Sequence, residues 1–145
     1  MSGKFKTWAE IIPGELRPTH SVLLTRDVIG RFARSVGETN PIYFDEHFAR
    51  STRHGGIIAP PSIHIYLIFA CTPEDDWMRT PGTINAGQSW SYNVPARADD
   101  TIRLEARALD RFVKKDRLFV IHDNTFFNQH GEVICAGRGW TIRPE

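Results

Sequence analysis

The sequence has 145 residues, of which 41% are hydrophobic and 24% are charged. Eighteen basic and seventeen acidic residues leave a formal net charge of +1. This length fits one folded domain spanning residues 1–145, and the apolar content is too high for a disordered chain. The near-neutral charge disfavours nucleic acid as the main partner, because binding phosphates requires a clear basic excess.

The compartment is predicted from hydropathy and from the cysteines. The most apolar stretch, residues 63–71, is far shorter than the ~20 residues that span a bilayer. Residues 1–18 contain no apolar run typical of a secretory signal. Cys71 and Cys135 lie far apart, each in an apolar stretch, so we expect buried free thiols. Together these features predict a cytoplasmic protein without a membrane segment.

The first half of the chain shows mainly helical spacing, after a short expected strand at residues 19–24. Thr25 is a suitable N-cap for the helix that follows, and Gly37 suits its C-terminal cap. Asp45 is expected to cap a second, short helix that ends near Ser51.

The most apolar segment of the chain, residues 62–71, follows Pro60 and Pro61. Proline suits the first turn of a helix, where its missing N–H needs no partner. Because the segment is apolar nearly all round, we expect a helix that is buried on all sides.

From Thr83 onward the pattern changes, and apolar side chains recur at every second position. A clear example is the series Ile102, Leu104, Ala106 and Ala108. Polar turns at residues 114–117 and 128–131 separate the predicted strands. One strand, a helical half and four antiparallel strands predict an α+β fold, in which an antiparallel sheet wraps a long central helix.

The loop after the first helix carries a motif that identifies a family. Six residues match, without gaps, the hydratase motif Gly-Asp-x-Asn-Pro-(Ile/Leu)-His-x-Asp and the Ala after it: Gly37, Asn40, Pro41, Ile42, Asp45 and Ala49. The chain therefore resembles the MaoC-like hydratases and dehydratases. These are hotdog-fold proteins that act on thioesters of coenzyme A or of acyl carrier protein. The resemblance follows the element order of the whole chain, and its specific part covers residues 32–63.

The chain departs from this family at three positions that carry chemistry. The catalytic Asp is replaced by Glu38, the catalytic His by Tyr43, and a His-Gly-Met at the head of the central helix by Pro60-Pro61-Ser62. In the family, the Asp and His hold the water that adds to the enoyl double bond. The Gly donates its N–H to the thioester oxygen.

Each departure weakens the usual chemistry. Glu38 places its carboxylate one methylene farther out, and a misplacement of about 1 Å can cost ~10²-fold in rate. Tyrosine, with an ordinary pKa near ~10, is a poor base at neutral pH. Pro61 has no N–H, so Ser62 offers the nearest amide for an oxyanion.

The same departures resemble the N-terminal, FAS1-like half of double-hotdog dehydratases and the non-catalytic subunits of two-chain versions. There the degenerate hotdog completes the acyl tunnel while a partner supplies the Asp and His. The resemblance thus implies a heterodimer or heterotetramer with a catalytic MaoC-like subunit, or a homodimer. It implies an acyl thioester as substrate, with coenzyme A as part of that substrate and no separate cofactor.

Two other functions remain open at this stage. A self-sufficient hydratase would use Glu38 with Tyr43 or His64 as the second group, since histidine has a suitable pKa. A binding module would hold acyl thioesters without chemistry. Asn40, Pro61 and Ser62 are the expected substrate-binding positions, although the Asn40 side chain equally suits a loop-stabilising role.

Several other residue types carry simpler interpretations. The remaining histidines show no metal-ligand spacing, and no nucleophile signature indicates a hydrolase. Trp90 and Tyr92 are expected in the core or at an interface. Most arginines of the strand half should form a solvated face, with one or two available for coenzyme A phosphates: Arg97, Arg103, Arg107, Arg111, Arg138 and Arg143.

Overall fold

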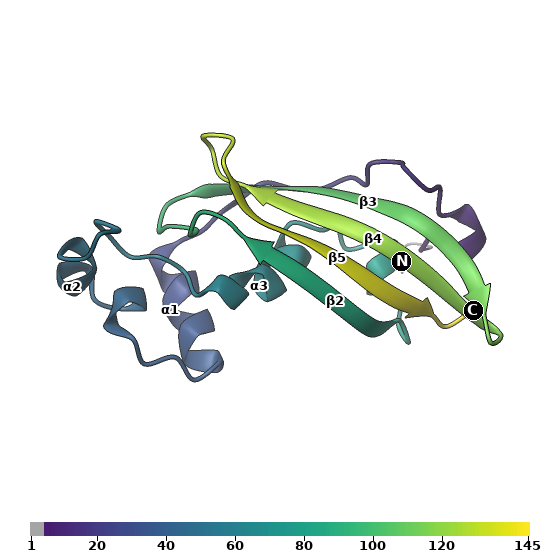
Figure 1. The fold of residues 1–145 in the computed structure, drawn as a ribbon, viewed down its shortest axis with the longest axis horizontal. Coiled ribbons are helices and arrows are strands. Elements are labelled where there is room, and N and C mark those ends of the chain that lie inside the picture. Colours follow the sequence, from purple (N-terminus) through teal and green to yellow (C-terminus); the bar gives the residue numbers. More distant parts are fainter. Residues whose placement is uncertain (1–4) are drawn as a thin grey trace.

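A five-stranded antiparallel sheet forms the body of the computed structural model, which describes residues 5–145. The order of strands across the sheet is β1-β3-β4-β5-β2 (Figure 1). The strands span β1 Val22–Leu23, β2 Ile84–Tyr92, β3 Thr101–Lys114, β4 Arg117–Phe127 and β5 Val133–Arg143. The short helices lie against one face of this sheet, which confirms the predicted α+β class.

The alternation seen in the sequence places one face of each strand in the core. In β3 the even-numbered residues from Ile102 to Ala108 are buried, and the intervening residues are mostly exposed. The turn from β3 to β4 uses Lys115 and Asp116, both with positive φ. Consecutive strands that pair antiparallel through short turns give the predicted meander, and β2 pairs at the far side of β5.

The helices of the first half begin at the predicted caps. Helix α1, Arg26–Ser35, starts after Thr25, whose hydroxyl accepts a hydrogen bond from the Val28 amide. Helix α2, Glu46–Arg50, starts after Asp45, whose carboxylate accepts one from the Phe48 amide. Both capping predictions are therefore confirmed.

The central helical segment is short. A 3-10 turn over Pro61–Ile63 leads into α3, His64–Ala70. Its Leu67 side chain is fully buried against the sheet. The expectation of burial on all sides is wrong, because Ile65, Tyr66 and Phe69 are all more than two-fifths exposed. The helix is apolar on two faces, and only one of them packs against this chain's own core.

The core lies between α1, α3 and the inner face of the sheet. Its largest fully buried side chains include Phe126, Leu24, Ile29, Ile63, Leu67 and Ile102. Cys71 and Cys135 are free and buried in the same cluster, as predicted. Burial raises the pKa of the Cys71 thiol to about 11 and that of Cys135 to about 12.

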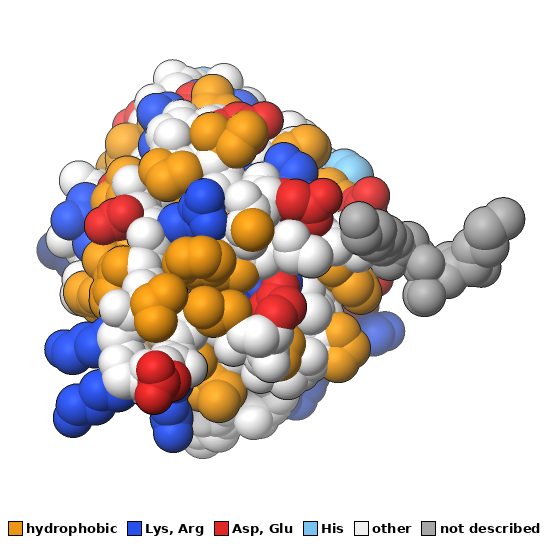
Figure 2. Space-filling view, turned by 90° about the vertical axis from the view of Figure 1, so that its right-hand side faces the viewer, with side chains coloured by type: hydrophobic (Ala, Val, Ile, Leu, Met, Phe, Trp, Pro, Cys, Tyr) orange, Lys and Arg blue, Asp and Glu red, His pale blue; other side chains and the backbone are white. Residues whose placement is uncertain are grey.

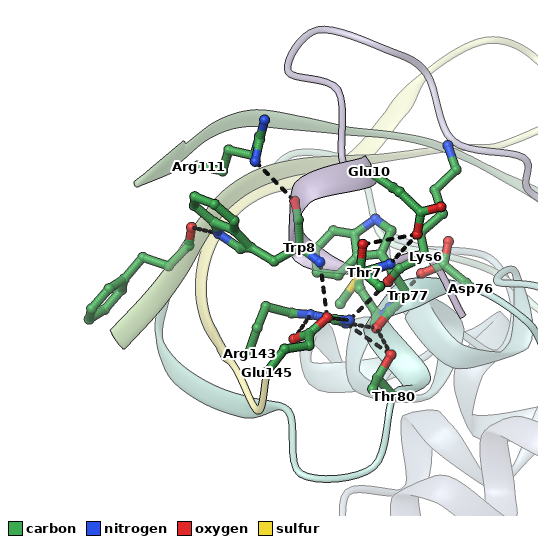
Figure 3. A network of polar contacts seen from close by, with 12 residues as sticks. Lys6, Thr7, Trp8, Glu10, Asp76, Trp77, Thr80, Arg111, Arg143 and Glu145 are labelled. Atoms are coloured by element: carbon green, nitrogen blue, oxygen red, sulfur yellow. Dashed lines mark hydrogen bonds and ion pairs between the residues drawn. The ribbon is translucent and has the colours of Figure 1, made fainter. Parts of the chain in front are cut away.

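A polar network closes the end of the sheet where β5 terminates (Figure 3). The buried Arg143 guanidinium donates to the carbonyls of Lys6 and Trp77, to the Thr80 hydroxyl, and to the Glu145 carboxylate. Arg143 is thus an exception to the expected solvated arginine face, since its side chain is only 1% exposed. On the outside of this end, hydrophobic side chains are interspersed with basic and acidic ones (Figure 2).

None of the helices within residues 5–145 is both long and apolar enough to cross a membrane.

Candidate functional site

The loop that carries the family motif is held by its own backbone and by Asn40. The Glu38 amide donates to the Ala33 carbonyl at the end of α1. The Asn40 side-chain oxygen accepts from the Ile42 amide at 3.0 Å and caps the 3-10 turn Pro41–Tyr43. The Asn40 oxygen is therefore engaged in shaping the loop, and this turn presents Tyr43 beside Glu38.

Glu38 and Tyr43 are close enough to influence each other electrostatically. Burial raises the pKa of the Tyr43 phenol, and the Glu38 carboxylate raises it further. The phenol consequently stays protonated at neutral pH, because its ordinary pKa is already near ~10. In this environment Tyr43 is a hydrogen-bond donor and not a base.

The head of the central helical segment offers few backbone donors. Pro60 is buried and accepts a hydrogen bond from the Ile63 amide at 2.9 Å, but neither Pro60 nor Pro61 has an N–H. The Ser62 amide is therefore the first N–H at this end of the segment.

His64 is the titratable side chain that follows this head. Its Nδ1 lies 3.1 Å from the Pro61 carbonyl oxygen and 3.5 Å from the Tyr92 hydroxyl. Since a carbonyl oxygen only accepts hydrogen bonds, Nδ1 carries the proton and Nε2 keeps a lone pair. Burial lowers the pKa of His64, and the hydrogen bond to Pro61 opposes this to a lesser extent. The imidazole is therefore neutral at pH 7.

Two cavities flank the His64–Tyr92 contact. The first, of about 200 Å³, is lined by Tyr43, Pro61 and Tyr92 together with apolar residues of the neighbouring loops. The second, of about 170 Å³, is lined by His64 and Trp90 and lies between α3 and the sheet. The structure thus brings Tyr43 and Pro61 to one cavity and His64 to the other.

Sequence reasoning did not place Trp90 and Tyr92 in this region. The His64 ring packs against Trp90 with centroids 4.1 Å apart, and against Tyr92 at 5.7 Å. Both aromatic rings lie on the side of β2 that faces α3, where Trp90 is half-buried and Tyr92 is exposed. Gly137 on β5 lies directly opposite Trp90, and a Cβ there would lie 2.3 Å from the indole. This glycine is therefore the sequence feature that makes room for the Trp90 ring.

The predicted arginines have mostly local partners. Arg138 forms a two-point ion pair with Asp123, and Arg103 lies over the Phe127 ring while it contacts Glu105. Arg97 donates to the His54 carbonyl at the rim of the first cavity. These three side chains are exposed, as expected for a solvated face, and the His54 partner of Arg97 lines the first cavity.

Comparison with known proteins identifies the family. Residues 13–136 match the family described as "FAS1-like, dehydratase domain region". A UPF0336 protein of Streptomyces griseus is 29% identical over 132 residues, which cover 82% of this chain and 83% of that protein. The unliganded R-hydratase PhaJ1 of Pseudomonas aeruginosa is 25% identical, with a TM-score of 0.81 over 95% of this chain and 85% of the hydratase.

A fold likeness also extends to a two-chain enzyme. A chain of the C-terminally truncated HadBC (3R-hydroxyacyl-ACP dehydratase) complex of Mycobacterium tuberculosis has a TM-score of 0.74 at 19% identity. The match covers 88% of this chain and 92% of that one. With the family match over residues 13–136 and the hotdog arrangement of sheet and helix, the chain belongs to the FAS1-like dehydratase domain family of MaoC-like hotdog proteins.

Proposed function

We propose that this chain is a subunit of an enoyl-thioester hydratase or 3-hydroxyacyl-thioester dehydratase, with a catalytic MaoC-like chain as its partner. In the hydration direction, water adds its hydroxyl to the β-carbon and a proton to the α-carbon of the enoyl group. This chemistry involves no oxidation and requires no cofactor besides the coenzyme A or acyl carrier protein that the substrate carries. The partner supplies the aspartate and histidine, and this chain completes the acyl-binding surface.

The observation that carries this proposal is the presence of a tyrosine at position 43, next to Glu38. The family places a histidine base at this position, whereas here burial and the Glu38 carboxylate both raise the phenol pKa. A group that remains protonated at pH 7 does not accept a proton from water. The absent N–H at Pro61 weakens oxyanion stabilisation as well. Both changes remove catalytic power while they leave the binding cavities intact.

The surface around α3 supports a partner chain. Ile65, Tyr66 and Phe69 expose a large apolar area beside β2, which forms one edge of the sheet. Edge strands and apolar patches are the usual sites of association between chains. The HadBC neighbour is itself a complex of two chains, which favours a related catalytic chain over an unrelated partner. A second copy of this chain, giving a homodimer, is the alternative occupant.

A self-sufficient hydratase is the second candidate function, and the tautomer of His64 favours it. The Pro61 carbonyl holds the proton on Nδ1, so Nε2 is unprotonated and its lowered pKa keeps it so. A neutral imidazole of this kind is a suitable general base. Glu38 would then hold the water, and His64 rather than Tyr43 would be the second group, since the two line different cavities.

The two candidates are separated by an assay of the chain with and without its partner. The partner is identified by co-purification from the native host, and both proteins are then produced separately. Crotonyl-CoA hydration is measured for each chain and for the mixture. Our proposal predicts turnover for the mixture and none for this chain alone. Full turnover by this chain alone would contradict it and favour the self-sufficient enzyme.

A further inference from the structure

An open groove of about 380 Å³ lies between helix α1 and the loop that carries the family motif. We call it the α1 groove, and its lining comprises four residues of α1 and two of the loop: Arg26, Asp27, Gly30, Arg34, Tyr43 and Phe44. Tyr43 also lines the first cavity, together with Pro61 and Tyr92. The α1 groove and the first cavity therefore adjoin at Tyr43.

The guanidinium of Arg34 lies against two walls of the α1 groove. It is positioned over the Phe44 ring, with Cζ 5.7 Å from the ring centroid. It also folds back along the helix, because a Cβ on Gly30 would lie 3.5 Å from its Nη2 and 3.6 Å from its Nη1. Residues four positions apart share one face of a helix, which is why Arg34 reaches Gly30. Since Gly30 and Phe44 both line the groove, the planar fork of Arg34 lies within it.

The charges around the α1 groove leave Arg34 without a carboxylate. The ion pairs of α1 and α2 join two carboxylates to three other guanidiniums: Asp27 to Arg31, and Glu46 to both Arg26 and Arg50. Within residues 5–145 the Arg34 side chain forms no ion pair, and its contact is with the Phe44 ring. Asp27 is the only acid among the six lining residues. The lining therefore carries a net positive charge.

This arrangement suits a phosphate. A guanidinium presents its N–H groups as a fork that matches two oxygens of a phosphate or carboxylate. A phosphate has further oxygens, so a second guanidinium can bind it from another side, whereas a carboxylate offers one pair only. Arg26 supplies that second guanidinium, since its Nη2 contacts Glu46 at 3.0 Å and its other N–H groups have no partner within residues 5–145.

We propose that the α1 groove binds the phosphate of the pantetheine arm of an acyl thioester, with Arg34 as the principal contact and Arg26 as the second. The inference rests on the proposed function, because it takes the substrate to be an acyl thioester. Coenzyme A and acyl carrier protein both carry a phosphate at this end of the pantetheine. The adjoining first cavity then receives the thioester side of the arm. The phosphate contact thus lies on α1 and not among the arginines of the strand half, which the sequence suggested.

The test compares two ligands that differ only in the phosphate. S-butyryl-pantetheine and S-butyryl-4′-phosphopantetheine are saturated, so neither is hydrated during the measurement. Each is titrated calorimetrically into the complex of this chain with its catalytic partner. We expect the phosphorylated ligand to bind about tenfold tighter, the order typical of hydrogen bonds between charged groups. Because the groove is open, this ratio should fall when the ionic strength is raised from about 0.05 M to about 0.5 M.

Three variants assign the preference to the α1 groove. Arg34→Gln keeps a helix-forming polar side chain without the charge, and it should bring the ratio of the two affinities close to one. Arg26→Gln should reduce the ratio less, because Glu46 already neutralises part of this charge. Arg117→Gln removes an exposed arginine at the start of β4, where the β3–β4 turn lies far from α1, and it should keep the tenfold ratio (Figure 1). The affinity for S-butyryl-pantetheine should be unchanged in all three, which shows that the variants are folded.

Two further ligands distinguish the sources of the phosphate. Butyryl-CoA and the butyryl form of the host's acyl carrier protein are titrated into the unmodified complex and into the Arg34→Gln complex. The thioester that loses about tenfold in affinity in the variant is the one whose phosphate the groove holds. A loss for either thioester supports the inference, and no loss for both would overturn it.

The outcomes also separate the inference from the proposed function. If S-butyryl-pantetheine and its phosphorylated form bind equally, or if the tenfold ratio persists in Arg34→Gln, the α1 groove does not bind the phosphate. The inference is then wrong, while the proposed function stands. If no butyryl thioester binds the complex, the proposed function itself fails and the inference fails with it.

Discussion

The imidazole of His64 on α3 packs against the indole of Trp90 on β2, with ring centroids 4.1 Å apart and the planes tilted by 32°. Trp90 in turn stacks on the buried Phe126 at 6.1 Å. The Pro61 carbonyl holds the same imidazole from the head of the helical segment. This stack connects the helix head to the edge strand, and His64 and Trp90 form one wall of the second cavity.

The exposed face of α3 should determine association. We expect Tyr66→Asp to weaken binding to the partner chain at least about tenfold, because a charge would then be buried against an apolar surface. Sedimentation velocity on the mixed proteins measures the effect. Val113→Asp introduces the same charge at an exposed position outside α3 and should leave association intact. Equal affinities for both variants would rule out the α3 face as the interface.

The buried His122 predicts a specific loss of stability in acid. Its pKa is about 4 in the folded protein and near ~6.5 in the unfolded chain, so the unfolded state binds a proton first as the pH falls. The free energy of unfolding should therefore drop by about 3 kcal/mol between pH 7 and pH 4 from this group. Below pH 4 both states are protonated, and this contribution stops growing.

Urea unfolding at a series of pH values checks this prediction. The stability of His122→Phe should fall less steeply over the window than that of the unmodified protein, because the variant has lost the titrating group. His47→Phe removes an exposed imidazole and should follow the unmodified curve. Parallel curves for the unmodified protein and His122→Phe would show that this imidazole is not buried in its neutral form.

The pattern of the sequence predicted the sheet well. Burial on one face forces period-two alternation, as in the even-numbered positions from Ile102 to Ala108, and turn residues mark the strand ends. The caps Thr25 and Asp45 were equally predictable, since each satisfies a local amide at the start of a helix. These features depend on neighbours in the chain.

The arrangement of the site depends on contacts that no local pattern contains. The sequence predicted burial on all sides of α3. An apolar pattern does not distinguish side chains that pack in the chain's own core from side chains that another surface would cover. The contact of His64 with Trp90 requires β2 to lie beside β5, which is a crossover in the order of strands. The buried imidazole of His122 is likewise predictable only once its neighbours Asn124 and Gly139 are in place.

Arg143 should contribute strongly to stability. We expect Arg143→Met to reduce the free energy of unfolding by about 3 kcal/mol, because the Lys6 carbonyl loses its donor and the Trp77 carbonyl and the Glu145 carboxylate lose their charged one. Urea unfolding of the full chain measures this loss. Arg138→Met removes an exposed arginine that is also paired with a carboxylate, and it should change stability little. Similar losses in both variants would contradict a special role for the buried network.

The central claim is that the partner chain, and not this chain, supplies the acid–base groups. It is tested most directly by removing the residues at the family's catalytic positions. The double variant Glu38→Gln, Tyr43→Phe keeps the shape of the loop but loses the carboxylate and the phenol. Its complex with the catalytic partner is assayed for crotonyl-CoA hydration beside the unmodified complex, after circular dichroism has established equal folding. Our proposal predicts a kcat within about threefold of the unmodified value, because neither side chain moves a proton. A fall of about 10²-fold or more would mean that this chain performs acid–base chemistry itself, and it would contradict the proposal.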